Sequence, residues 1–164
     1  MTRFQSGEYT ATFGDSWREA TVVRFMGLDV GEVRIGVALS DETGLIARGL
    51  TTLQRVSWKQ DLETLMALID ENQVGHIVVG HPLNLDGSQG PQADKIADFV
   101  GRLREATAIE ISLWDERLSS SSAERVLLEG GVQRGKRKQI IDKLAAVIIL
   151  QNFLDHRNCH STPG

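Results

Sequence analysis

Three aspartates, Asp29, Asp115 and Asp142, occupy positions where a packed domain rarely places an acid. Asp29 ends one apolar, strand-like stretch and Asp115 ends another, whereas Asp142 lies in the first turn of a predicted helix. Aspartate is depleted in strands, and burying an unpaired carboxylate is costly. Acids at the ends of central strands therefore indicate a metal ion, a cationic partner or a proton-transfer role.

Each of these acids also has an ordinary structural explanation. Asp29 could cap a hairpin turn, Asp115 could pair with Arg117, and Asp142 could complement a helix dipole. These explanations are independent of one another, and all three would have to hold. The predicted topology instead brings the three acids to one end of one sheet, which favours a common cause. We therefore predict a shared site.

That topology follows from the spacing of apolar residues. Residues 25–29 and 33–39 form two apolar stretches around a short turn, which predicts an antiparallel hairpin. The remaining predicted elements are strands over 45–53, 76–80 and 109–115 and helices over 58–72, 91–106, 119–129 and 139–155. We expect an α/β fold with a five-stranded mixed sheet in the order 3-2-1-4-5, helices on both faces, and parallel first, fourth and fifth strands.

The predicted sheet gives the site its dimensions. One strand separates the first from the fifth, so their ends lie roughly 10 Å apart, and the strand between them ends at Gly80, which has no side chain. After the inward reach of Asp29 and Asp115, the remaining gap suits one or two divalent ions, because paired catalytic ions sit about 3.5–4 Å apart. Three carboxylates without a His or Cys cluster favour Mg²⁺ or Mn²⁺ over zinc. Glu116 points to the opposite strand face from Asp115, so we rank it lower.

Cationic and polar residues near these acids are candidates for substrate binding. A basic loop precedes the Asp142 helix, and a turn-rich loop over 81–90 follows the fourth strand. Either could be an ordinary solvated connection, but beside a metal site they become plausible contacts to a phosphate backbone. The candidates are Arg34, Asn84, Ser88, Arg117, Arg134, Lys136, Arg137 and Lys138.

Length and composition limit the alternatives. A chain of 164 residues is one ordinary domain, and we place it at 25–155, between an extension over 1–24 and a polar tail over 156–164. The net charge of −4 gives no general support for nucleic-acid binding, so a local patch must provide it. The single Cys159 and the lack of an apolar run or signal peptide fit a cytoplasmic protein without a membrane partner.

Four ordered motifs resemble the YqgF/RuvX family, whose members are described as pre-16S rRNA nucleases and as Holliday junction resolvases. The motifs are GLDVGEVRIGVALSD from Gly27, IVVGHPLNLDGSQGPQA from Ile77, WDERLSSSSAE from Trp114 and GKRKQIIDKLAAVIILQNFLD from Gly135. The resemblance implies a ribonuclease H-like fold and a divalent-metal phosphodiesterase, with Asp29, Asp115 and Asp142 at the catalytic acid positions. It also implies a cytoplasmic role in ribosomal RNA maturation.

These inferences predict hydrolysis with two metal ions, one held by Asp29 and Asp142 and the other by Asp29 and Asp115. The expected substrate is a structured RNA or a branched DNA. Resolution of a four-way DNA junction is the alternative reaction, and it would favour a two-fold homodimer. An actin-like ATPase and a non-catalytic nucleic-acid or ribosome-binding module are the rivals from other classes.

Overall fold

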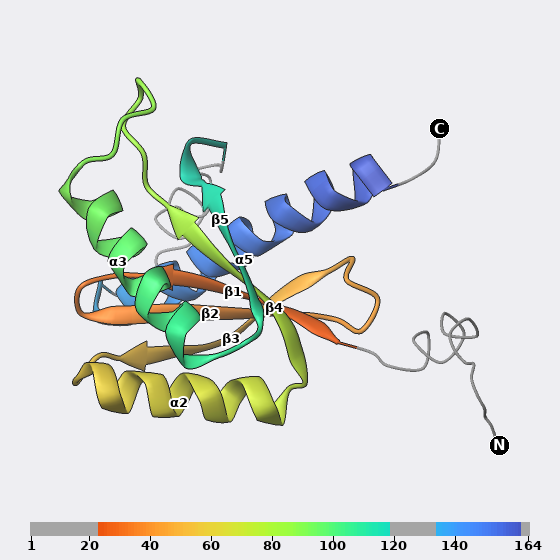
Figure 1. The fold of residues 1–164 in the computed structure, drawn as a ribbon, viewed down its shortest axis with the longest axis horizontal. Helices are drawn as coiled ribbons and strands as arrows, with labels where there is room; N and C mark the ends of the chain where they lie inside the picture. Colours follow the sequence, from red (N-terminus) through yellow and green to blue (C-terminus); the bar gives the residue numbers. More distant parts are fainter. Residues whose placement is uncertain (1–22, 119–133, 162–164) are drawn as a thin grey trace, which may run out of the picture.

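The computed structural model describes residues 23–118 and 134–161. Figure 1 shows a twisted sheet with helices α2 and α3 on one face and helix α5 on the other. This arrangement confirms the predicted α/β architecture. The helix that we predict over 119–129 lies outside the described residues.

The sheet has the predicted strand order, β3-β2-β1-β4-β5. Strands β1, β2 and β3 form an antiparallel meander, whereas β4 and β5 run parallel to β1. The strands are β1 (Arg24–Val30), β2 (Arg34–Ser40), β3 (Ala47–Gln54), β4 (Val74–His81) and β5 (Glu110–Asp115). Because β1 lies at the centre, its residues are buried on both faces, which explains its continuous apolar sequence.

Local sequence signals mark where the two helices on the α2–α3 face begin. Helix α2 (Trp58–Glu71) is capped by Ser57, whose hydroxyl accepts a hydrogen bond from the Gln60 amide at 3.2 Å. Helix α3 (Pro91–Ala106) begins with proline, which lacks the N–H that a first helical turn cannot use. A short 3-10 helix, η2 (Glu116–Leu118), follows β5 directly.

Helix α5 (Arg134–Ser161) is longer than we predicted, with 28 residues. The basic segment at 134–138 forms its first turns, so the predicted basic loop is wrong. Lysine, arginine and glutamine are good helix formers, and one glycine inside a helix costs only about 1 kcal/mol. The helix also continues through most of the expected polar tail, and Arg24, expected in the extension, belongs to β1.

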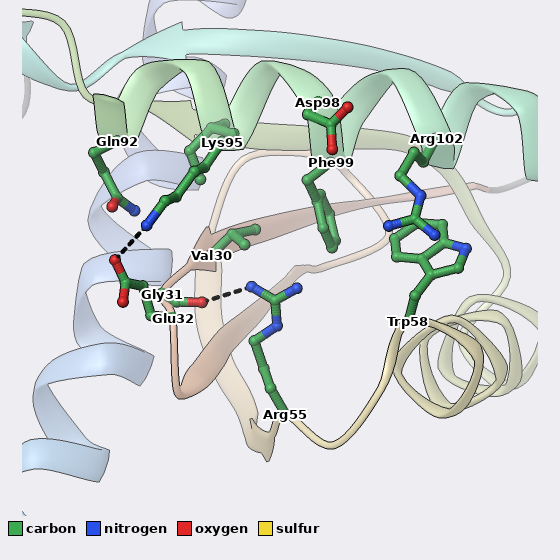
Figure 2. A pocket seen from close by; sticks show the side chains of 11 residues that line it. Val30, Gly31, Glu32, Arg55, Trp58, Gln92, Lys95, Asp98, Phe99 and Arg102 are labelled. Carbon is green, nitrogen blue, oxygen red and sulfur yellow. Dashed lines mark hydrogen bonds and ion pairs between the residues drawn. The ribbon is translucent and has the colours of Figure 1, made fainter. Parts of the chain in front are cut away.

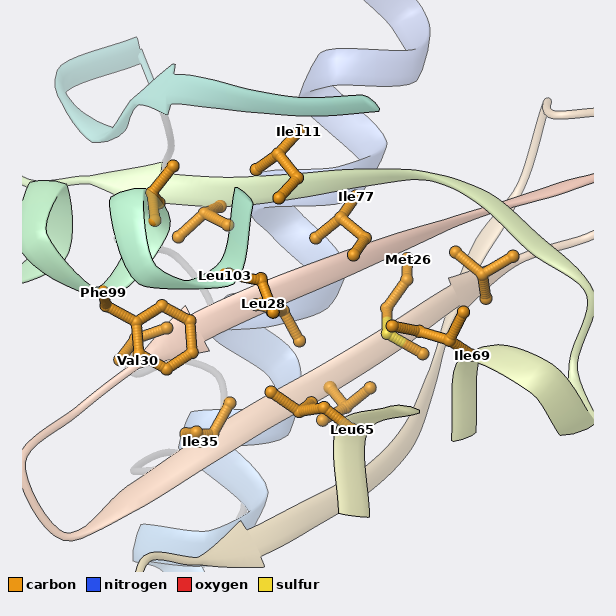
Figure 3. Packing of buried hydrophobic residues seen from close by; sticks show 14 of the residues in the cluster. Met26, Leu28, Val30, Ile35, Leu65, Ile69, Ile77, Phe99, Leu103 and Ile111 are labelled. Atoms are coloured by element: carbon orange, nitrogen blue, oxygen red, sulfur yellow. The ribbon is translucent and has the colours of Figure 1, made fainter. Parts of the chain in front are cut away.

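Two apolar layers hold the sheet between these helices. Figure 3 shows the larger one, where Met26 and Leu28 of β1 meet Leu65 of α2 and Leu103 of α3. The smaller layer packs β1, β2 and β4 against Ala146, Ile149, Leu150 and Leu154 of α5. A Cβ atom built on Gly27 would lie 2.7 Å from the Leu150 Cβ atom and 3.0 Å from the Ala146 carbonyl oxygen. The missing side chain therefore lets α5 lie directly on β1.

The described part of the chain contains no helix that is both long and apolar enough to span a membrane.

Candidate active site

Asp29 lies near the end of the central strand, on the face that α5 covers. It follows Gly27 by two residues, so the two positions share one face of β1, and Gly27 is the position that contacts α5. On β2, Asp29 is paired with Gly36. Asp29 therefore lies on the face of the sheet that α5 covers.

Asp115, the last residue of β5, and Glu116, the first residue of η2, lie on opposite faces of the sheet. Ile111 packs in the α2–α3 layer and Trp114 packs in the α5 layer. By alternation, Asp115 belongs to the α2–α3 face. Glu116 is the first residue of η2 and lies against Gly80, on the face that carries Asp29. A Cβ atom built on Gly80 would lie 2.6 Å from Ile149 Cδ1 of α5 and 3.1 Å from the Glu116 carboxyl carbon, so both side chains occupy the gap left by that glycine.

The structure therefore puts Glu116, which we ranked below Asp115, on the face of the sheet that carries Asp29. Alternation does put Glu116 opposite Asp115, but the face that matters is the one occupied by Asp29. The sequence contains no direct signal for this position, because Glu116 and Gly80 become neighbours only through the pairing of β4 with β5. Side-chain direction on two separate strands can be compared only when their register is known.

The electrostatics of Glu116 also differ from those of Asp115. Burial raises the pKa of Glu116 to about 7, and the charges of Asp29 and then Asp115 add to the rise. The Asp29 and Glu116 carboxylates therefore repel each other when both are ionised. A divalent cation between them would offset that repulsion.

Asp115 is instead held by Arg117. Its Oδ2 atom accepts a hydrogen bond from Arg117 Nη2 at 2.6 Å, and its Oδ1 atom accepts one from Arg117 Nε at 3.0 Å. This hydrogen-bonded contact lowers the pKa of Asp115 from its ordinary value. The structure therefore contains the ion pair that we considered as the ordinary explanation of this acid.

The position of Asp142 follows from the path of α5. Phe153 lies against Phe25 at the start of β1, with ring centroids 6.0 Å apart, and Leu150 lies over Gly27 further along the strand. The helix and the strand therefore run in opposite directions, so earlier residues of α5 lie nearer the Asp29 end. Asp142 precedes the buried Ala146 by one helical turn. Its side chain, and those of Arg134, Lys136, Arg137 and Lys138, lie outside the described part of the structure.

The polar residues predicted to contact substrate have structural partners. Asn84 Nδ2 donates a hydrogen bond to Ser88 Oγ at 2.9 Å, and Ser88 Oγ donates one to Asp86 at 2.6 Å. These contacts fold the loop between β4 and α3. Arg34 opens β2 beside the turn after Asp29, and its carbonyl oxygen accepts a hydrogen bond from the Gly31 amide at 2.8 Å.

A hollow lies on the other face of the sheet, where α2 and α3 meet the β1–β2 turn (Figure 2). Its volume is about 200 Å³. The charges around it are largely matched, because Lys95 pairs with Glu32 at 2.8 Å and Arg55 pairs with Asp61 at 3.3 Å. Arg102 stacks over the Trp58 ring at 4.3 Å. The acids of the candidate site do not line this hollow.

The donor set fits a hard divalent cation. Carboxylate oxygens are the ligands that Mg²⁺ and Mn²⁺ prefer, and Asp29 with Glu116 supplies them on the α5 face. Among the side chains that the structure describes, no group of three or more His, Cys, Asp or Glu residues is placed to hold a metal ion. Asp29 and Glu116 alone therefore do not make a complete ligand set, and the side chain of Asp142 lies outside the described part of the structure.

Comparisons with known proteins show to which family the chain is similar. Residues 23–156 match the family model RuvX, described as Holliday junction resolvase. A relative from Thermoanaerobacter pseudethanolicus, provisionally named a pre-16S rRNA nuclease, is 55% identical over 134 residues, covering 81% of this chain and 96% of the relative. A relative of the same name from Clostridioides difficile is 53% identical over 134 residues, covering 82% of this chain and 95% of that one.

A solved structure, T. thermophilus RuvC in complex with Holliday junction substrate, superimposes with a TM-score of 0.54 at 15% identity. The match covers 87% of this chain and 99% of that one, and it confirms the ribonuclease H-like fold. The match to the family model and the identity to its members show that this chain belongs to the RuvX family of nucleases.

Proposed function

We propose that this protein is a divalent-metal-dependent endonuclease that hydrolyses phosphodiester bonds during 5′-end processing of pre-16S rRNA in the cytoplasm. The observation that carries the proposal is the pair formed by Asp29 and Glu116. The two residues lie on the same face at the end of the sheet, and the charge of Asp29 adds to the burial that raises the pKa of Glu116 to about 7. The names of the relatives supply the substrate class.

We assign the metal ligands to Asp29, Glu116 and Asp142. Asp115, which we first expected as a ligand, would lie at the edge of the site, where Arg117 holds its carboxylate. When bound, Mg²⁺ or Mn²⁺ would supply Lewis acidity and an activated water at this position. Glu116 would release its proton on metal binding, because its pKa is already near neutral.

Cationic side chains would then orient the RNA. Arg34 stands near the turn that follows Asp29, and the first turns of α5 carry Arg134, Lys136, Arg137 and Lys138. Their charges would contact phosphates on either side of the scissile bond, which positions the backbone for in-line attack. Arg117 would hold Asp115 and remain partly available to substrate, because its side chain is 35% exposed.

Cleavage of a four-way DNA junction is the second candidate, because the family model carries that description. One experiment compares the two reactions. A pre-16S leader RNA and a four-way DNA junction are incubated separately with wild type and Asp29→Asn, in Mn²⁺ and in chelator. We expect metal-dependent cleavage of the RNA that the variant loses. Cleavage by Asp29→Asn at the wild-type rate would refute the site, and binding without cleavage would indicate a non-catalytic module.

A further inference from the structure

One apolar side chain near the candidate site has no structural role within the described residues. Leu85 is 95% exposed, more than any other large apolar residue there. It stands at the tip of the loop between β4 and α3, which projects beyond the sheet beside η2 (Figure 1). An exposed leucine can bury its apolar surface only against a partner.

The exposure of Leu85 is built into the loop. The Asn84 amide donates a hydrogen bond to the Ser88 carbonyl at 2.9 Å, and Leu83 and Gln89 form a β-bridge. Gly87 has a φ of +90°, a value that side chains rarely permit, so the turn depends on this glycine. These contacts fix the backbone on both sides of Leu85 and present its side chain outward.

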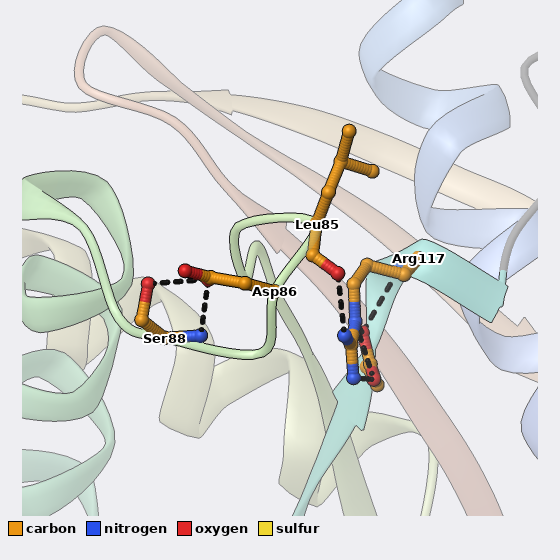
Figure 4. A network of polar contacts seen from close by, with 5 residues as sticks. Leu85, Asp86, Ser88 and Arg117 are labelled. Atoms are coloured by element: carbon orange, nitrogen blue, oxygen red, sulfur yellow. Dashed lines mark hydrogen bonds and ion pairs between the residues drawn. The ribbon is translucent and has the colours of Figure 1, made fainter.

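The same loop is tied to the acidic end of the sheet. Arg117 Nη1 donates a hydrogen bond to the Leu85 carbonyl at 3.3 Å, while the same guanidinium holds Asp115. Figure 4 shows the Leu85 side chain pointing away from Arg117 and from the Asp86–Ser88 turn. One side chain therefore links the exposed leucine to the residue that precedes Glu116.

The chemistry of the loop selects which part of a nucleic acid it could contact. Residues 82–90 include no lysine or arginine, and Asp86 would repel phosphates. An apolar tip without cations matches the faces of bases, and proteins use such side chains as wedges between base steps. Opening a step costs least where stacking is already incomplete, at a helix end or a branch.

We propose that Leu85 is a wedge that inserts between bases at the end of an RNA helix, next to the phosphodiester that the acids cleave. The inference rests on the proposed function and goes beyond it. Leu85 would make the enzyme selective for RNA with a helix end, whereas the acids act on any phosphodiester brought to them. Arg117 would set the distance between the wedge and the cleaved bond.

The test uses a pre-16S leader stem with 2-aminopurine at its terminal base pair, and an unstructured RNA of the same length. Wild type, Leu85→Ser and Leu85→Met are compared with Val56→Ser, which changes another aliphatic residue that is 72% exposed. Binding and fluorescence are measured in chelator, and kcat and KM are measured in Mn²⁺. Because a buried leucine loses its apolar contact, we expect Leu85→Ser to raise KM for the stem about tenfold.

The unstructured RNA should be processed equally well by all variants. The wild type, Leu85→Met and Val56→Ser should increase 2-aminopurine fluorescence on the stem, whereas Leu85→Ser should not. If Leu85→Ser retains both the fluorescence increase and the wild-type KM, the wedge is refuted while the nuclease function stands. If wild type neither binds nor cleaves either RNA, the proposed function fails and the wedge fails with it.

Discussion

Replacing Glu116 with glutamine should make the metal-free protein more stable while removing its response to metal. Glutamine keeps the shape of the side chain and removes the charge that Asp29 and the buried surroundings disfavour. The folded-state pKa of Glu116 is raised from 4.5 to about 7. Stability linked to this carboxyl is therefore fully present below pH 4.5 and is lost as the pH rises through 7.

The size of the effect follows from that rise. A fully enclosed carboxyl with this pKa would destabilise the charged protein by about 3 kcal/mol. Glu116 remains partly exposed, so solvent screening reduces the expected effect to about 1–2 kcal/mol. We expect Glu116→Gln to match wild type at pH 4 and to exceed it by about 1–2 kcal/mol at pH 8, in chelator.

Urea denaturation followed by tryptophan fluorescence measures this difference. Adding Mg²⁺ should stabilise wild type and leave Glu116→Gln nearly unchanged, because binding to the folded state stabilises it by mass action. Asp115→Asn is the matched control, because it should change the stability at pH 8 in the opposite direction. The pKa of Asp115 is lowered by Arg117, so this carboxylate adds stability above its unfolded pKa that is lost as the pH falls.

Asp115→Asn should therefore reduce stability at pH 8, where Glu116→Gln increases it. If the two variants change stability in the same direction at pH 8, or if Glu116→Gln remains sensitive to Mg²⁺, our assignment of the two acids is wrong.

Three further predictions test the site and its support. Asp29→Asn should lower kcat for RNA cleavage by about a thousandfold or more while circular dichroism and RNA binding in chelator stay at wild-type values. Gly27→Ala should cost about 1–3 kcal/mol in urea denaturation, because its Cβ atom would lie 2.7 Å from the Leu150 Cβ atom. The control Gly101→Ala, at a helical position with nothing within 4 Å, should stabilise the protein by about 0.5–1 kcal/mol. Arg117→Ala should raise the pKa of Asp115, observed by NMR titration, because its guanidinium lowers that pKa.

The sheet order could be predicted from the sequence because its signals are local. A short turn between two apolar strands forces a hairpin, and a helix between two apolar strands favours a parallel crossover. Pro91 and the C-terminal Ala106 bound α3 where we predicted them. The start of α5 was missed because Gly135 and the run of cations at 134–138 are typical of a solvated loop.

The sequence by itself determined which residue types are available: acids at strand ends, glycines between them and a resemblance carried by four ordered motifs. Only the tertiary structure decided which acids face one another. The pairing of β4 with β5 and the position of α5 put Glu116 beside Asp29 and left Asp115 to Arg117. The physical reason is that alternation fixes side-chain direction within one strand, while register and helix placement decide which face of the sheet becomes the site.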